Sequence, residues 1–312
     1  MTQQVPDFRE LGKQYSNWGR WGEDDELGTL NFITPQAIAA ACQSVRDGKV
    51  FSLGIPFDEN GPQPGGVRIN PVRLMSQTGH GQDFPGGFRY ADDFVFMPLQ
   101  CATQWDALAH VYYDDRIYNG YPASVVTTAG ALKCSIDKVA RGIVGRGVLL
   151  DVARHKGERW LPPNFVIDGA LLEEVARAQG VEIRPGDILL FRTGWRTKFV
   201  TDGNRQEFMS AEPGLGLRSI PWLYEKQVAA VASDNWAIEA FGPNLFGEDP
   251  NALLPVHMVL IRDMGMTLGE MFDLDELAED CARDGRWDFL FVGPPIKFTR
   301  AVGSPVNPLA IK

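Results

Sequence analysis

Side chains that can bind a metal ion or move a proton are concentrated in one stretch, Gln100-Cys-Ala-Thr-Gln-Trp-Asp-Ala-Leu-Ala-His110. If this segment is a strand, Gln104 and Asp106 lie on one face, because side chains alternate along a strand. If the chain becomes helical after Asp106, His110 lies one turn beyond that carboxylate. Either arrangement brings a carboxylate close to an imidazole. The plainer alternative is a hydrogen-bonded Asp–His pair at the end of an element, without a chemical role.

Two further candidates lie much later in the chain. His257 falls within 252–264, where apolar residues recur at helical spacing and predict an amphipathic helix. Glu270 follows a glycine and precedes Met271 and Phe272, so it is a carboxylate in apolar surroundings. A lone histidine beside an apolar helix face is usually a core residue, and the local pattern alone leaves the role of His257 open.

The elements that must position these residues alternate between helix and strand from residue 134 onward, which is typical of an α/β protein. Strands are expected at 50–57, 94–99, 147–153, 188–192, 228–233 and 289–292. Helices are expected at 35–47, 136–141, 169–179, 220–226, 252–264 and 274–283. The sequence shows no internal repeat and no linker-like segment. We therefore expect one domain over residues 1–312.

Residues 60–93 are rich in Gly, Pro, Asn and Asp and predict a long ordered loop, which in compact proteins is often functional. His80 lies in this loop. Its plainer interpretation is a solvated histidine, and the alternative is a contact with substrate. Trp18, Trp105 and Tyr112 are further candidates for the walls of a substrate pocket, although aromatic residues more often pack in the core.

Composition excludes several classes of protein. The chain has 312 residues, of which 44% are apolar and 22% charged, so it can bury a sizeable core. The formal net charge of -10 and the lack of a basic stretch argue against nucleic acid and anionic membranes as partners. No signal peptide and no apolar run near the roughly 20 residues of a membrane span is apparent. The 4 cysteines lack metal-site spacing. We expect a cytoplasmic protein that acts on a small molecule.

The central stretch resembles the motif of the cyclase-like metal-dependent hydrolases, the superfamily of bacterial kynurenine formamidase and isatin hydrolase. That motif reads His-x-Gly-Thr-His-x-Asp-x-Pro-x-His. Thr103, Asp106 and His110 match it, whereas Gln100 and Gln104 stand in place of its first two histidines, and a leucine replaces its proline. The two glutamines concern the first metal site of the family.

The resemblance continues through most of the chain. His257 and Glu270 match the later histidine and glutamate of the family, and further similar stretches lie at 21–31, 147–154, 186–195 and 303–308. The resemblance implies an α/β fold with a mixed central sheet flanked by helices, the swivelling β/α/β fold of the cyclase family. It also implies a homodimer or homotetramer.

The same resemblance implies the chemistry of the site. Asp106, His257 and Glu270 would hold one divalent ion, Zn²⁺ or Mn²⁺, because one imidazole and two carboxylates suit these metals. The amides of Gln100 and Gln104 are poorer ligands than imidazole, so we expect one ion, with Gln100 as at most a weak ligand.

The residues of the motif then have expected roles in catalysis. His110 would act as general base and acid. Thr103, Gln104 or Gln100 would donate to a developing oxyanion.

The expected activity is metal-dependent hydrolysis of a small cyclic or aromatic amide or lactone. Two alternatives remain open at this point. The first is a non-hydrolytic metal-dependent lyase or dehydratase, because a metal and a histidine base can also remove a proton next to a carbonyl. The second is a catalytically inactive homologue that binds a small molecule. The retained residues argue against it; they are Asp106, His110, His257 and Glu270.

Overall fold

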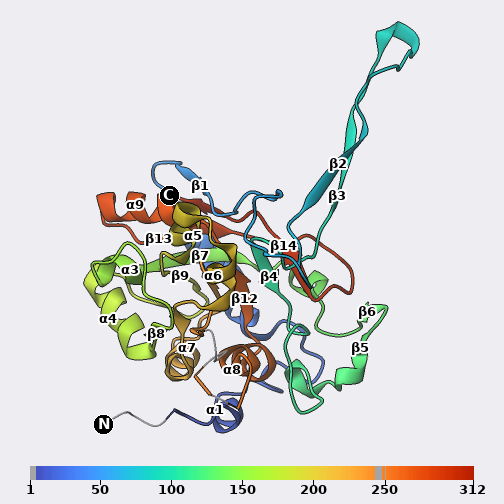
Figure 1. Ribbon diagram of the computed structural model, residues 1–312. Helices are drawn as coiled ribbons and strands as arrows, with labels where there is room; N and C mark the ends of the chain where they lie inside the picture. The colour runs from blue at the N-terminus through green and yellow to red at the C-terminus, as the bar shows by residue number, and fades with distance from the viewer. Residues whose placement is uncertain (1–4, 243–247, 250) are drawn as a thin grey trace.

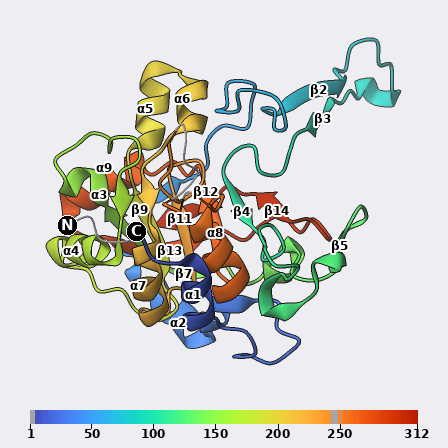
Figure 2. The same ribbon diagram turned by 60° about the horizontal axis from the view of Figure 1, so that its bottom comes forward.

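The computed structural model describes residues 5–242, 248–249 and 251–312. Its centre is a nine-stranded mixed sheet with the strand order β1-β15-β13-β7-β9-β11-β12-β4-β14 (Figures 1 and 2). Strands β7, β9, β11 and β12 are parallel, and the strands on either side of this group pair antiparallel with their neighbours. The strands of the sheet are β1 Val50–Ser52, β4 Gln104–Asp106, β7 Val144–Asp151, β9 Ile188–Arg192, β11 Ala230–Ser233, β12 Thr267–Glu270, β13 Asp288–Val292, β14 Gly303–Pro305 and β15 Leu309–Ile311.

Helices cover both faces of this sheet. They are α1 Phe8–Gln14, α2 Pro35–Ala41, α3 Val152–His155, α4 Gly169–Gln179, α5 Trp195–Asp202, α6 Arg205–Ser210, α7 Ile220–Glu225, α8 Pro255–His257 and α9 Asp275–Asp284. A π-helix, Met258–Met264, continues directly from α8. Three small sheets pair β2 Val72–Gln77 with β3 Asp92–Phe96, β5 Val126–Thr127 with β6 Gly130–Ala131, and β8 Val166–Ile167 with β10 Gly214–Leu215. Among the described residues, no helix is both long and apolar enough to cross a bilayer.

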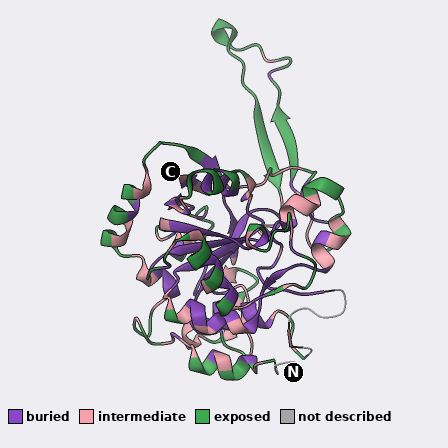
Figure 3. Ribbon diagram, turned by 90° about the vertical axis from the view of Figure 1, so that its left-hand side faces the viewer, coloured by how far each residue is buried: buried purple, intermediate pink, exposed green. Residues whose placement is uncertain are grey.

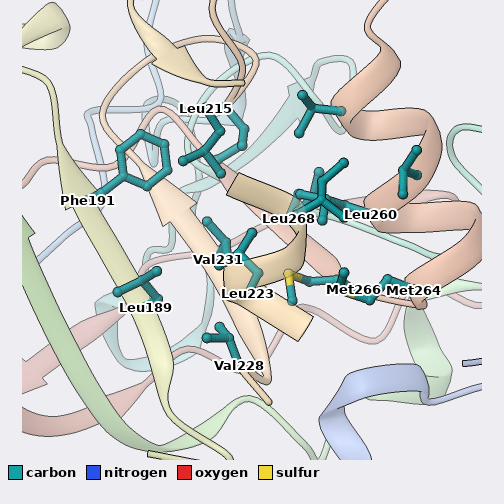
Figure 4. Close-up of a cluster of buried hydrophobic side chains, with 14 of the residues drawn as sticks. Leu189, Phe191, Leu215, Leu223, Val228, Val231, Leu260, Met264, Met266 and Leu268 are labelled. Carbon is teal, nitrogen blue, oxygen red and sulfur yellow. The ribbon is translucent and has the colours of Figure 1, made fainter. Parts of the chain in front are cut away.

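Two hydrophobic clusters lie on opposite faces of the sheet. Along β9, Leu189 and Phe191 belong to the cluster beneath α4, α7 and the π-helix, part of which Figure 4 shows. The intervening Ile188 and Leu190 belong to the cluster beneath α9. A strand buried on both faces needs a continuous apolar run, and this explains why β9 reads as one in the sequence.

The expected α/β architecture, a mixed sheet flanked by helices, is confirmed. Helix α4 and strand β9 have the predicted bounds. The carboxylate of Asp168 accepts from the Leu171 N–H at 2.9 Å at the start of α4, and Gly180 ends it with φ 67°. The helix expected at 35–47 is wrong beyond Ala41, where a 3₁₀ turn follows, and the helix expected from residue 252 begins only at Pro255.

The long loop expected at 60–93 is wrong in its middle and at its end. Residues 72–77 form β2, which pairs with β3 in a hairpin that projects from the body of the protein (Figures 1 and 3). All residues of both strands are exposed, so the sequence has no alternation of buried and exposed positions to reveal β2. Helices α1, α5 and α6 were also not predicted, and each is shorter than 9 residues.

Gly269, on β12 beside the candidate site, offers a test of how tightly the sheet is packed. A Cβ added there would lie 2.7 Å from Trp105 Cζ3 and 2.8 Å from Ala232 Cβ. We expect Gly269→Ala to lower the free energy of unfolding by about 1–3 kcal/mol, the usual cost of overpacking. Urea unfolding measures it, with Gly145→Ala on β7 as the control, because a Cβ there meets nothing closer than 3.7 Å. Equal stability of the two variants would contradict this interpretation.

Candidate metal centre

The centre of the candidate site is the pairing of β4 with β12. In this antiparallel pair Gln104 lies opposite Glu270, and Leu268 lies opposite Asp106. Gln104 Nε2 donates to Glu270 Oε2 at 2.6 Å, and Asp106, two residues further, shares the face of Gln104. The strand alternative for this stretch is therefore confirmed, and it brings a carboxylate from each strand to one place.

His257 reaches the same place from α8. Its Nε2 lies 3.1 Å from Glu270 Oε1, and its Nδ1 lies 2.7 Å from Glu239 Oε1. The two oxygens of Glu239 also accept from the backbone N–H groups of His257 at 2.9 Å and Val256 at 3.0 Å. Glu239 thus fixes the imidazole in position and directs Nε2 towards Glu270, an arrangement typical of histidines that bind metals.

The three predicted ligands are brought together. Asp106, His257 and Glu270 each offer an atom within 4.8 Å of the others, and all three residues are buried. Asp106 Oδ1 is buried and has no hydrogen-bond partner among the described residues. A buried carboxylate oxygen without a partner is costly, and a cation would satisfy it. One nitrogen and two carboxylate oxygens therefore fit a divalent transition metal.

The surroundings of His257 favour positive charge at this place. Burial alone would lower the pKa of His257, but its hydrogen bonds to Glu239 and Glu270 raise it to about 10. Burial raises the pKa of Asp106 to about 6, although His110 opposes this shift. The carboxylates around His257 thus stabilise a cation, whether it is an imidazolium or a bound metal ion.

His110 lies beside this group without being part of it. After β4 the chain makes a single turn, closed by the His110 N–H donating to the Ala107 carbonyl at 2.9 Å. Its Nε2 lies 3.7 Å from Asp106 Oδ1, beyond hydrogen-bond distance, and its side chain is 20% exposed. Burial lowers the pKa of His110, so the imidazole is neutral at neutral pH. It is therefore placed to accept a proton from something that enters the site.

The two glutamines have different surroundings. Gln104 donates to Glu270, and its buried Oε1 has no partner among the described residues. Gln100 lies against β14, because a Cβ added at Gly303 would be 2.5 Å from its Nε2. Gly303 pairs with Asp106 across the strands, so Gln100 stays at the edge of the site.

Thr103 and Trp105 have structural contacts in place of the expected roles. The Thr103 hydroxyl donates to the Met271 carbonyl at 2.6 Å and accepts from the Ile55 N–H at 2.8 Å, so its proton is already used. Trp105 points to the opposite face of β4, since side chains alternate, and its Nε1 donates to the Gly293 carbonyl at 2.8 Å. The side chains of these two residues contact backbone groups and do not line the site.

Two of the three remaining candidates for substrate contact are placed elsewhere. His80 is exposed in the hairpin connection between β2 and β3. Trp18 donates from Nε1 to the Arg262 carbonyl at 2.7 Å. The guanidinium carbon of Arg262 lies 4.7 Å from the centre of the Trp18 ring. Tyr112 is 40% exposed and follows His110 by two residues, so it remains near the site along the chain.

Sequence reasoning missed three residues that belong to this region. Glu239 could have been noticed as an acid inside the apolar run Ala-Ile-Glu-Ala-Phe. Glu212 is buried, which raises its pKa well above the ordinary value, and it accepts from the N–H groups of Trp236 and Ala237 in the loop that carries Glu239. Arg68 donates to the Gln100 carbonyl at 3.2 Å, and no sequence signal distinguishes it within its Gly- and Pro-rich segment.

The chain is similar to known proteins over most of its length. Residues 32–240 match the family model described as putative cyclase, a range that includes β4 and Glu239 but ends before His257. A solved structure described as a novel cyclase is 42% identical, covers 95% of this chain and 99% of its own, and has a TM-score of 0.88. No curated protein matches the sequence significantly.

More distant solved structures share the fold. An isatin hydrolase bound to the product analogue thioisatinate is 19% identical and covers 89% of this chain and 98% of its own, with a TM-score of 0.61. Isatin hydrolase A from Ralstonia solanacearum is 20% identical and covers 89% and 97%, with a TM-score of 0.63.

The contact between Glu239 and His257 leads to a prediction about metal affinity. Glu239→Gln keeps an acceptor for the backbone but removes the charge beside Nδ1, so we expect Zn²⁺ to bind about 10–100-fold more weakly. Calorimetric titration with Zn²⁺ measures it. Glu174→Gln is the matched control, because Glu174 also contacts an imidazole, that of His155 at 2.8 Å, but at the surface. Unchanged affinity in Glu239→Gln would contradict the role assigned to Glu239.

Proposed function

This chain belongs to the putative cyclase family, and we propose that within it the protein is a metal-dependent hydrolase of a small cyclic or aromatic amide or lactone. One observation carries the proposal: a buried group of Asp106, His257 and Glu270 lies beside His110, which is partly exposed and outside the group. The fold shared with isatin hydrolases supports the same reaction class. A site of this kind has both a place for a cation and a separate proton acceptor.

Asp106, His257 and Glu270 would hold Zn²⁺ or Mn²⁺. Such an ion supplies Lewis-acid chemistry, in that it polarises a carbonyl group and makes water more acidic. Glu239 keeps Nδ1 of His257 engaged, so that Nε2 is the nitrogen available to the ion. Gln104 fixes one oxygen of Glu270 through its amide and leaves the other directed towards His257. The chain itself therefore sets the orientation of two of the three ligands.

His110 moves the proton in this proposal. Neutral at neutral pH, its imidazole takes a proton from the attacking water as the new C–O bond forms at the carbonyl carbon. It returns that proton to the leaving nitrogen or oxygen as the C–N or C–O bond breaks. The amide of Gln100 makes no hydrogen bond within the described residues and is the candidate donor to the developing oxyanion. Thr103 is a poor candidate because its proton is held by the Met271 carbonyl.

Two measurements test the reaction class. A panel of cyclic amides and lactones is assayed with protein stripped of divalent ions and then resupplied with Zn²⁺ or Mn²⁺. If the reaction is hydrolysis, turnover is lost when the ion is removed and returns when the ion is resupplied. In labelled water, the product then carries ¹⁸O in a new carboxylate. Turnover without ¹⁸O incorporation would favour the lyase alternative. A protein that binds the ion and the compounds but turns over none would be the inactive homologue.

His110→Ala separates proton transfer from metal binding. We expect kcat to fall by about 10²–10⁴-fold, the usual contribution of a general acid–base group, while the protein keeps its ion and fold. The assay measures turnover and bound metal on the same sample. His155→Ala is the control, since among the described residues that imidazole hydrogen-bonds to Glu174 alone, at the surface. Loss of the ion would make His110 a ligand, and normal turnover would leave it without a catalytic role.

A further inference from the structure

Arg68 is a partly buried cation beside the candidate site. It lies in the segment between β1 and β2, donates from Nη1 to the Gln100 carbonyl at 3.2 Å, and has its guanidinium 6.0 Å from the ring centre of Trp236. No carboxylate among the described residues lies within ion-pair distance of it. Four other arginines with little exposure do have such a partner: Arg146 pairs with Asp187, Arg192 with Asp151, Arg196 with Asp273 and Arg262 with Asp263. Arg205, partly buried like Arg68, donates to the carbonyls of Gly61 and Glu59.

Arg68 is connected to the edge of the candidate site through Gln100. The carbonyl that it binds belongs to Gln100, whose side chain lies against Gly303 of β14. Gly303 pairs with Asp106 across the strands. Arg68 therefore lies on the Gln100 side of the site.

An uncompensated guanidinium at this position is unfavourable for two reasons. Partial burial removes water from the charge without supplying an anion. The same charge opposes any cation held by Asp106, His257 and Glu270. An anionic group that enters with the substrate would relieve both costs, and the planar fork of a guanidinium matches a carboxylate. The neighbouring Trp236 offers a second donor, because its buried Nε1 has no partner among the described residues.

We propose that Arg68 binds a carboxylate carried by the substrate, so that the protein acts on small amides or lactones that are already anionic. This inference rests on the proposed hydrolase function and names its substrate class. The carboxylate is a second group, distinct from the one that hydrolysis creates. Recognition of the new carboxylate alone would favour product binding and would not distinguish one substrate from another.

Binding of simple probes tests the role of Arg68 without turnover. Benzoate and benzamide are titrated by calorimetry into wild type, Arg68→Gln and Arg68→Lys, each loaded with Zn²⁺ and again after removal of divalent ions. We expect Arg68→Gln to weaken benzoate by about tenfold or more, since charge-assisted hydrogen bonds are the strong ones, and to leave benzamide unchanged. Arg68→Lys should recover part of the loss. The effect should persist without Zn²⁺, because it does not depend on the ion.

Arg73→Gln is the matched control, because it removes the same charge from an exposed residue of β2. Circular dichroism checks that each variant is folded. Equal benzoate affinity in wild type, Arg68→Gln and Arg68→Lys would overturn the inference, while metal-dependent hydrolysis of neutral amides or lactones would leave the proposed function standing. If Arg68→Gln loses affinity for benzoate but wild type hydrolyses no compound of the panel, the role of Arg68 as an anion-binding residue stands and the proposed hydrolase function fails.

Kinetics distinguish substrate recognition from product binding. With a hydrolysed compound from the panel, wild type is compared on a carboxylated form and on its methyl ester. We expect a lower KM for the carboxylate form and loss of that preference in Arg68→Gln. A preference that survives Arg68→Gln would mean that the carboxylate is recognised elsewhere, which would overturn the inference.

Discussion

The structure depends on how three buried carboxylates are compensated. Asp106, Glu239 and Glu270 surround one imidazole, that of His257, and burial of this much negative charge is unfavourable without positive charge among them. His257 compensates part of this negative charge, because both of its ring nitrogens contact a carboxylate. The unpartnered Oδ1 of Asp106 shows that part remains. The site is therefore built around a cation, and the surrounding elements serve to hold the carboxylates close together.

The neighbouring elements hold these groups by backbone pairing and not by side-chain contact alone. β4 lies between β12 and β14, so both of its edges are fixed, and Gln104 and Asp106 have no freedom to move apart. Trp105, between them, is anchored on the other face against Phe272 and Phe291. The histidine ends α8 directly before a π-helix, a local irregularity that is common at functional sites. The acidic residues are thus held in place before any ligand arrives.

Much of this could be predicted from the sequence, for physical reasons. Strand β9 is a continuous apolar run and helix α4 has both caps, so local chemistry defined their ends. The shared face of Gln104 and Asp106 follows from alternation alone. Glu239 and Arg68 could not be found in this way, because each acts on residues distant in the chain and neither lies in a periodic pattern. The hairpin of β2 and β3 was not predicted because neither strand has a buried face to produce alternation.

The positions of the two glutamines favour a single cation in the proposed site. Gln104 donates an N–H group to Glu270, and this orientation presents its amide oxygen, a weak ligand, to the buried interior. A second cation beside the first would have to share Asp106 and overcome the repulsion between two dications, with only neutral amides to assist. The positive charge of Arg68 would oppose it further. In the proposed mechanism the charges of the site are divided. Asp106 and Glu270 would hold one cation together with His257, while Arg68 and the amide of Gln100 would contact the substrate.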